Sequence, residues 1–113
     1  MAFIDARVPV RFAPPDTITA GDAVLIEGTA PEPEGHPVAR FTLPVTGHFS
    51  GCACCLPRGP VAEALSRLFQ ARARGEVAFF RAVMAVPATA AGETAIRAAL
   101  AEDVFVAACF RAG

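Results

Sequence analysis

The sequence predicts a single small α/β domain, three-layer-like, with a mixed sheet of about four strands. Three observations lead to this fold class. The chain has 113 residues, which is the usual size of one compact domain. Its N-terminal part holds three short apolar runs separated by proline-rich loops. A segment with helical periodicity then stands between two strand-like runs, which is the order of a βαβ unit.

The three N-terminal runs are expected to be strands. "RVPVRF" and "VARFTLPV" alternate with the period of two that a strand requires. "DAVLIEG" is a short apolar run that ends at a glycine, which is typical of a buried strand. Because Pro9 has no N–H to donate to a ladder, we expect the first strand at an edge of the sheet. The expected strands cover residues 7–12, 22–28 and 38–45.

The two loops between these strands bear on the topology. Each is about ten residues long, and each contains prolines that prevent a helix. A parallel crossover usually needs a dozen or more residues that include a helix. We therefore expect the first strands to be antiparallel, or to reach positions that are not neighbours.

A helix is expected over residues 60–74. Pro60 suits the first helical position and Gly75 suits the C-terminal stop. Glu63 and Arg67 stand four residues apart and can form an ion pair on its surface. The buried strand expected over 77–86 completes one βαβ unit after the cysteine motif, with a right-handed crossover.

The C-terminal part predicts a second helix over residues 89–103. Thr89 is expected to cap it, and Glu93 can pair with Arg97. Its inward face is expected to carry Ile96, Leu100 and Val104. The tail "VFVAACFRAG" fits the period of a helix and that of a strand, and we favour a helix.

Composition and charge exclude several functions. The net charge is −1, so nothing suggests a nucleic-acid partner or an acidic membrane. Every basic residue is arginine, and a Walker-type phosphate loop needs a lysine. The start "MAFIDARVPV" lacks the pattern of a secretory signal, and no apolar run reaches the roughly 18 residues of a membrane span. We expect a cytoplasmic protein with reduced thiols, of bacterial composition rich in Ala, Arg and Pro.

Three cysteines within four positions form the main candidate site. Cys52, Cys54 and Cys55 follow a predicted strand and precede a predicted helix, where α/β sheets place their sites. Three thiolates can hold a soft or borderline metal ion, with His48, a water or a partner as fourth ligand. Two alternatives remain open. The thiols could do redox chemistry, or they could be small buried residues in a tight turn.

The remaining candidates are single residues. Glu27 ends a buried strand and could reach a metal, although carboxylates at strand ends are commonly solvated. Arg58 could bind an anion or satisfy backbone carbonyls, and His36 is expected to be exposed in its loop. Cys109 is expected to pack in the core. No Ser/His/Asp set and no carboxylate pair can be argued from spacing.

The stretch "GCACCLPRGPV" resembles the CobW-type GTPases, a family of metal-trafficking P-loop proteins with GCxCC after a strand. The resemblance is best over residues 47–86. It departs where the family has its phosphate loop, since this chain reads "APPDT", and where the family has Glu-Thr-Thr-Gly, since it reads "AVPA". Pro60 replaces the family's Asp. The resemblance implies that Cys52, Cys54 and Cys55 are metal thiolates in a shortened domain, residues 1–113, without the nucleotide-binding loop.

These observations lead to one expected function and two alternatives. The expectation is a metal-binding, metallochaperone-like accessory protein for a zinc or cobalt ion, with no nucleotide and no enzymatic activity. It would work with a protein partner or as a metal-bridged homodimer, because one chain clusters only three thiols. The alternatives are a protein-interaction domain that binds no metal, and a thiol redox protein.

Overall fold

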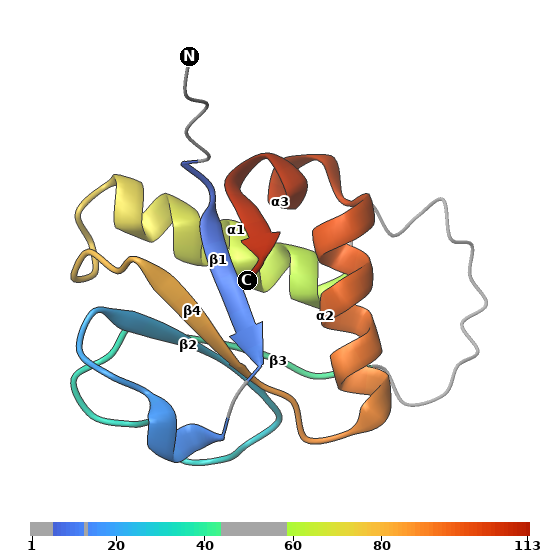
Figure 1. Cartoon of the computed structure of the whole chain (residues 1–113), viewed down its shortest axis with the longest axis horizontal. Helices are drawn as coiled ribbons and strands as arrows, with labels where there is room; N and C mark the ends of the chain where they lie inside the picture. Colours follow the sequence, from blue (N-terminus) through green and yellow to red (C-terminus); the bar gives the residue numbers. More distant parts are fainter. Residues whose placement is uncertain (1–5, 13, 44–58) are drawn as a thin grey trace.

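The computed structural model describes residues 6–12, 14–43 and 59–113, and in these residues a five-stranded sheet packs against three helices (Figure 1). The strands are β1 (Val8–Phe12), β2 (Asp22–Glu27), β3 (Val38–Phe41), β4 (Ala82–Val86) and β5 (Phe110–Ala112). The helices are α1 (Pro60–Ala73), α2 (Ala90–Glu102) and α3 (Val104–Cys109), with a short 3-10 turn, η1, at Pro15–Thr17.

The sheet is parallel throughout, in the order β3-β2-β4-β1-β5. The prediction of a mixed sheet of about four strands with antiparallel first strands is therefore wrong. Strand β4 lies between β1 and β2, so the loop that joins these two strands crosses over it. Strands β2 and β3 are parallel neighbours, in register from Val24↔Val38 to Glu27↔Phe41.

No helix joins β2 to β3, because these strands are short. The connection covers residues 28–37, and extended backbone of that length spans roughly 33 Å. Strand β2 has six residues, which corresponds to about 20 Å. The loop can therefore return to the start of the sheet without the helix that the usual parallel crossover needs.

Pro9 lies in an interior strand, against expectation, because β1 pairs with both β4 and β5. The Gly113 N–H donates to the Val10 carbonyl from the β5 side, at 2.9 Å. Since successive residues of a strand point their backbone groups to opposite sides, the Pro9 nitrogen faces β4. The ladder with β4 begins at Val10↔Val83, so the missing donor falls before its first paired residue.

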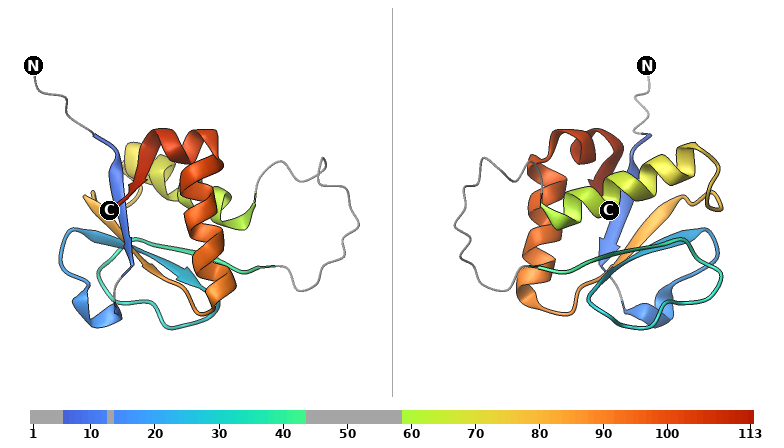
Figure 2. Two further views of the ribbon diagram at one scale, coloured as in Figure 1. Left: turned by 45° about the vertical axis from the view of Figure 1, so that its right-hand side comes forward. Right: turned by 180° about the vertical axis from the view of Figure 1, so that it is seen from behind.

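All three helices pack on one face of the sheet, where they form one hydrophobic core. Alternate strand residues reach this face, among them Val10, Leu25 and Val83, and none of these is more than 1% exposed. The helices contribute the buried side chains of Val61, Leu65, Leu68, Ile96, Leu100 and Val106. Figure 2 shows the helices together on this side of the sheet.

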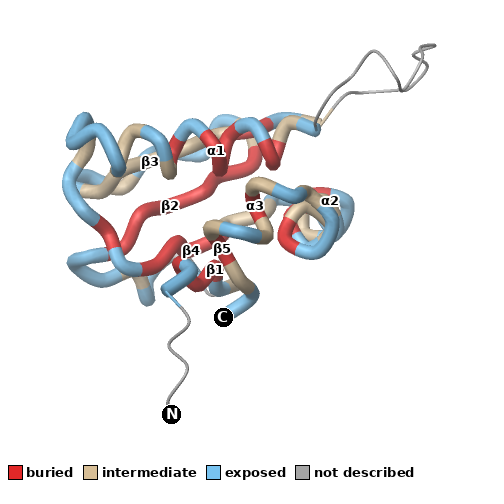
Figure 3. The backbone as a smooth tube through the Cα atoms, turned by 90° about the horizontal axis from the view of Figure 1, so that it is seen from above, coloured by how far each residue is buried: buried red, intermediate tan, exposed pale blue. Residues whose placement is uncertain are grey.

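Loops, not helices, border the opposite face of the sheet. Val24 and Ile26 point to this face and are buried, although neither belongs to the core under the helices. They share a hollow with Ile18, Pro31 and Pro33 from the loops that follow β1 and β2. In Figure 3, β2 is therefore buried along its length. The expected three layers are reduced to a helical layer, a sheet and two loops.

The helix predictions agree with the structure. Helix α1 buries one face, and Arg67 pairs with Glu63 at 3.6 Å. Thr89 caps α2 by accepting the Gly92 N–H at 2.9 Å, as predicted. Within α2, Arg97 pairs with Glu93 at 2.8 Å, as predicted.

The C-terminal tail is a helix over Val104–Cys109 and a strand over Phe110–Ala112. Asp103 ends α2 and its carboxylate accepts the Val106 N–H, which starts α3. The chain then becomes extended at Phe110 and pairs with β1. Val104 is 86% exposed, so its predicted inward position is wrong. The helix predicted for the whole tail ends at Cys109.

Strand β4 is shorter than predicted. It begins at Ala82, and the preceding Phe79 is 67% exposed, outside the sheet. Strand β3 ends at Phe41, and the predicted residues 44–45 lie outside the described part of the chain. Among the helices that the structure describes, none is long and apolar enough to cross a membrane.

Candidate functional site

Because all five strands are parallel, their carboxyl ends lie at the same end of the sheet. Strand β3 ends there at Phe41, and α1 begins at Pro60 after the connection that follows β3. The thiol motif belongs to this connection. Its candidate ligands, and Arg58, fall on residues 44–58, which lie outside the described residues. These candidates are Cys52, Cys54, Cys55 and His48.

Glu27 is a buried charged group at this end of the sheet. It is the last residue of β2, and its Oε1 accepts the N–H groups of Ala88 and Thr89 at 2.7 and 2.9 Å. The Thr89 hydroxyl donates to Oε2 at 2.8 Å. The first N–H groups near a helix start lack partners within the helix and attract anions. The start of α2 therefore has the chain's own carboxylate as its anion.

The pKa of Glu27 reflects two opposing effects. Burial raises it, since the residue is only 8% exposed and a buried carboxylate prefers to be neutral. Hydrogen bonds from the Thr89 side chain and from the N–H groups of Ala88 and Thr89 lower it, and together they prevail. The net result is a pKa below the ordinary value of 4.5. Glu27 is therefore a buried anion that joins β2 to α2, and it is not the solvated carboxylate considered above.

Gly92 allows this close approach. A Cβ atom at this position would collide with the Glu27 carboxylate, so any residue other than glycine would displace it. Gly92 is buried within the first turn of α2. The need for glycine here is steric and comes from a strand that is distant in sequence.

His36 lies at the amino-terminal end of β2. Its Nδ1 is 2.9 Å from the carbonyl oxygen of Asp22, the first residue of β2. Because a carbonyl only accepts, Nδ1 carries the proton in this contact. The ring is half-buried, which corrects the expected exposure.

Cys109 packs, partly buried, against the core under the helices. Burial raises the pKa of its thiol, which favours the neutral form over the thiolate that binds metals. Within residues 6–12, 14–43 and 59–113, no group of three or more His, Cys, Asp or Glu residues could hold a metal ion.

The connection after β1 differs from a phosphate-binding loop. Such a loop leads from a strand into a helix whose first N–H groups face the phosphates. Here the described residues 14–21 contain only the 3-10 turn Pro15–Thr17, and the next element is β2. The sequence also has no lysine to reach a phosphate.

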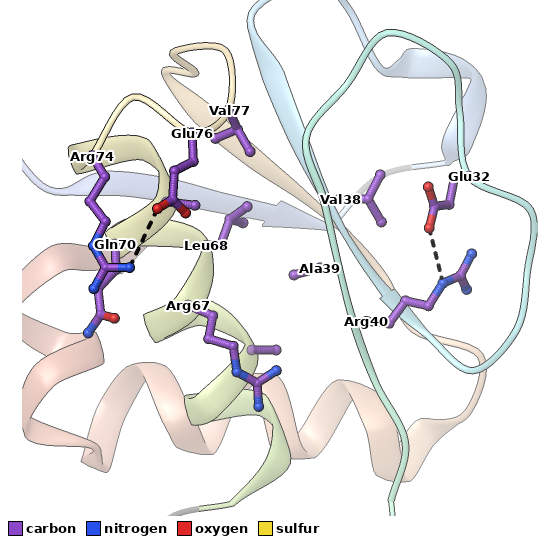
Figure 4. A pocket seen from close by; sticks show the side chains of 12 residues that line it. Glu32, Val38, Ala39, Arg40, Arg67, Leu68, Gln70, Arg74, Glu76 and Val77 are labelled. Carbon is purple, nitrogen blue, oxygen red and sulfur yellow. Dashed lines mark ion pairs between the residues drawn. The ribbon is translucent and has the colours of Figure 1, made fainter.

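Sequence reasoning missed a groove between α1 and β3 (Figure 4). Its volume is about 590 Å³. Apolar side chains and charged or polar side chains both line it. A signal was present in the sequence, since Arg67 and Arg74 stand two helical turns apart on one face of α1. The sequence does not indicate that β3 is the strand that lies across the groove from α1.

Comparison with known proteins finds no family model, no curated protein and no solved structure that matches this chain.

Proposed function

We propose that this protein is a metal-binding accessory protein that holds a zinc or cobalt ion through the thiolates of Cys52, Cys54 and Cys55. It binds and hands on the ion and catalyses no reaction. The observation that carries the proposal is the concentration of three thiols in four positions, on the connection that leaves the carboxyl end of β3. Thiolates are the ligands preferred by soft and borderline ions.

The position of this connection supports a binding role. In parallel α/β sheets, ligands bind outside the carboxyl ends of the strands. Strand β3 ends at that edge, and α1 begins after the thiols. A reducing, cytoplasmic compartment of a bacterial cell would keep the three thiols available for a metal.

The fourth ligand has few sources. Glu27 is engaged by the start of α2, and Cys109 packs against the core. His36 binds a carbonyl at the amino-terminal end of β2. His48, a water or a ligand from a second protein therefore completes the site. A site that needs a second protein suits transfer of the ion to a partner, or a metal-bridged homodimer.

The proposed activity is independent of nucleotide. The resemblance to CobW-type GTPases rests on the GCxCC motif, while the residues after β1 form a 3-10 turn and include no lysine. Metal binding would then be constitutive, or would depend on the protein partner alone.

The test is the metal content of untagged protein purified under reducing conditions, by inductively coupled plasma mass spectrometry. A Cys52→Ser, Cys54→Ser, Cys55→Ser triple variant is compared with Cys109→Ser, which leaves the motif intact. We expect about one ion per chain, or half that in a bridged dimer, in the parent and in Cys109→Ser only. Metal-free parent protein, even after reconstitution with zinc and cobalt, would contradict the proposal and favour an interaction domain.

A further inference from the structure

The hollow on the loop-covered face of the sheet lies where the chain changes direction. Strands β2 and β4 are neighbours, and Ile26 pairs in register with Val86 near their carboxyl ends. From β2 the chain continues to β3 at one edge of the sheet. From β4 it continues through α2 and α3 to β5 at the other edge. Open α/β sheets bind their ligands at such a switch point.

The lining of this hollow is apolar. Seven of the eight residues that line it have apolar side chains, and its volume is about 320 Å³. Val24 and Ile26 are buried, whereas Ile18, Pro33 and Val86 are half-buried and present apolar surface to solvent. An apolar cavity of about 150 Å³ holds one benzene molecule. The hollow is larger than that, so a compound of one or two rings fits its volume.

The hollow offers no free charge to a ligand. Among the described residues that line it, only Glu32 is charged, and its carboxylate pairs with the Arg40 Nε at 3.4 Å (Figure 4). The other two nitrogens of the Arg40 guanidinium donate to the carbonyls of Gly28 and Ala30, at 2.8 and 2.6 Å. An ion in the hollow would lose water without gaining a charged partner, which is unfavourable. The lining therefore favours a neutral ligand.

Hydrogen bonds hold both loops that border the hollow. The Arg40 contacts fix the loop after β2, which also contains prolines that restrict its backbone. In the loop after β1, the Thr17 N–H donates to the Pro14 carbonyl at 2.9 Å. The Thr19 N–H donates to the Asp22 carboxylate at 2.9 Å, so the residue between these two threonines is held from both sides. The site is therefore formed in advance, and binding needs little further ordering of the chain.

We propose that this hollow binds a small neutral compound with an apolar ring. The ring lies against Ile18, Val86 and the prolines of the loop after β2, as in ligand pockets that are lined mainly by apolar side chains. The hollow lies on the face of the sheet without helices, and none of the three clustered thiols lines it. This inference therefore does not depend on metal binding.

The test uses indole as the probe, because indole is neutral, apolar and bicyclic. Its binding to the full chain, with labelled methyl groups, is followed by nuclear magnetic resonance. We expect saturable shifts at the methyl groups of Ile18, Ile26 and Val86, with a Kd of about 1 mM. The methyl groups of Leu65 and Ile96, in the core under the helices, should not shift. Shifts at those core methyl groups, or no saturable shift at several millimolar indole, would overturn the proposal.

Benzyl alcohol and benzoate test the charge of the ligand at nearly equal size. Benzyl alcohol should shift the same methyl groups as indole. Benzoate should bind about tenfold more weakly, because no free cation in the lining can neutralise its carboxylate. Equal affinities would contradict selection for a neutral ligand.

Val86→Phe fills the hollow and is expected to weaken indole binding about tenfold. Val104→Phe is the matched control, since Val104 is 86% exposed on α3, in the helical layer on the other face of the sheet. Equal affinities of these two variants would overturn the proposal. If Val86→Phe does not fold, Ile18→Ala removes lining contacts from a loop and should weaken binding about threefold, and unchanged binding would contradict the site.

Sedimentation of the unmodified protein tests the other possible occupant. We expect the same sedimentation with and without indole. A dimer that dissociates when indole is added would identify an apolar side chain of a second copy as the occupant, and would overturn the proposal.

Discussion

The carboxylate of Glu27 occupies the space that a Cβ atom on Gly92 would need. This contact joins the end of β2 to the first turn of α2. The backbone N–H groups that hold the carboxylate belong to Ala88 and Thr89, which follow Glu27 in the sequence by 61 and 62 positions. The Glu27 carboxylate is therefore a buried anion at the carboxyl end of the strands. Substitutions of Glu27, Thr89 and Gly92 test how much it contributes to the stability of the fold.

Gly92→Ala should destabilise the protein, although alanine normally favours a helix over glycine by about 1 kcal/mol. The new methyl group would push the Glu27 carboxylate off its donors, and we expect a loss of about 2 kcal/mol in the free energy of unfolding. Urea unfolding measures it. In a Glu27→Ala background the same change should become neutral or stabilising. A stabilised single variant would contradict the contact.

Glu27→Gln should change the pH dependence of stability. Because the pKa of Glu27 is lower in the folded protein, its carboxylate stabilises the fold above the ordinary value of 4.5. That contribution is lost as the pH falls through the lowered pKa. The variant should be less stable than the parent at neutral pH, and the difference should shrink below pH 4.5. Urea unfolding across this range measures it, with Glu63→Gln as an exposed control. A constant difference would contradict the assignment.

Thr89→Val should destabilise the protein by about 1 to 2 kcal/mol. The Thr89 hydroxyl donates to Glu27 and accepts the Gly92 N–H, so valine of similar shape loses both hydrogen bonds. Thr89→Ser keeps the hydroxyl and should stay close to the parent. Thermal unfolding of the two variants separates the hydrogen bonds from the packing. Equal losses for serine and valine would show that packing alone matters.

Phe79→Ala should cost about 1 kcal/mol, more than its exposure suggests. The guanidinium of Arg72 lies 4.1 Å from the ring centroid of Phe79, in a cation–π contact. Val104→Ala, at another strongly exposed apolar side chain, should cost less than about 0.5 kcal/mol. In an Arg72→Met background the cost of Phe79→Ala should fall. An unchanged cost there would assign the effect to packing.

The helices of this protein could be predicted from the sequence because their signals are local. Pro60 and Gly75 mark the limits of α1, and Thr89 marks the start of α2, all within or next to the elements that they bound. The topology could not be predicted in the same way. Strand β4 lies between β1 and β2 in the sheet, although it begins more than sixty residues after β1 ends.

Two single residues show the same limit. Pro9 correctly indicates a missing donor, but its place in the sheet depends on where the β4 ladder begins. The sequence places Glu27 at the end of a strand, but spacing alone does not predict its partners at the start of α2. A charged residue directly after an apolar run indicates a carboxylate that needs partners. Only the folded structure shows which groups those partners are. The thiol motif itself remains a prediction from sequence.

The order of the strands also governs how this chain can fold as it leaves the ribosome. Strand β1 is made before the other four strands, yet both of its neighbours, β4 and β5, are made after β2 and β3. Until residue 82 emerges, only β2 and β3 can pair, and the apolar side chains of β1 have no sheet to join. The core therefore cannot close until β4 has been made, and the growing chain depends on β4 and β5 to cover the apolar side chains of β1.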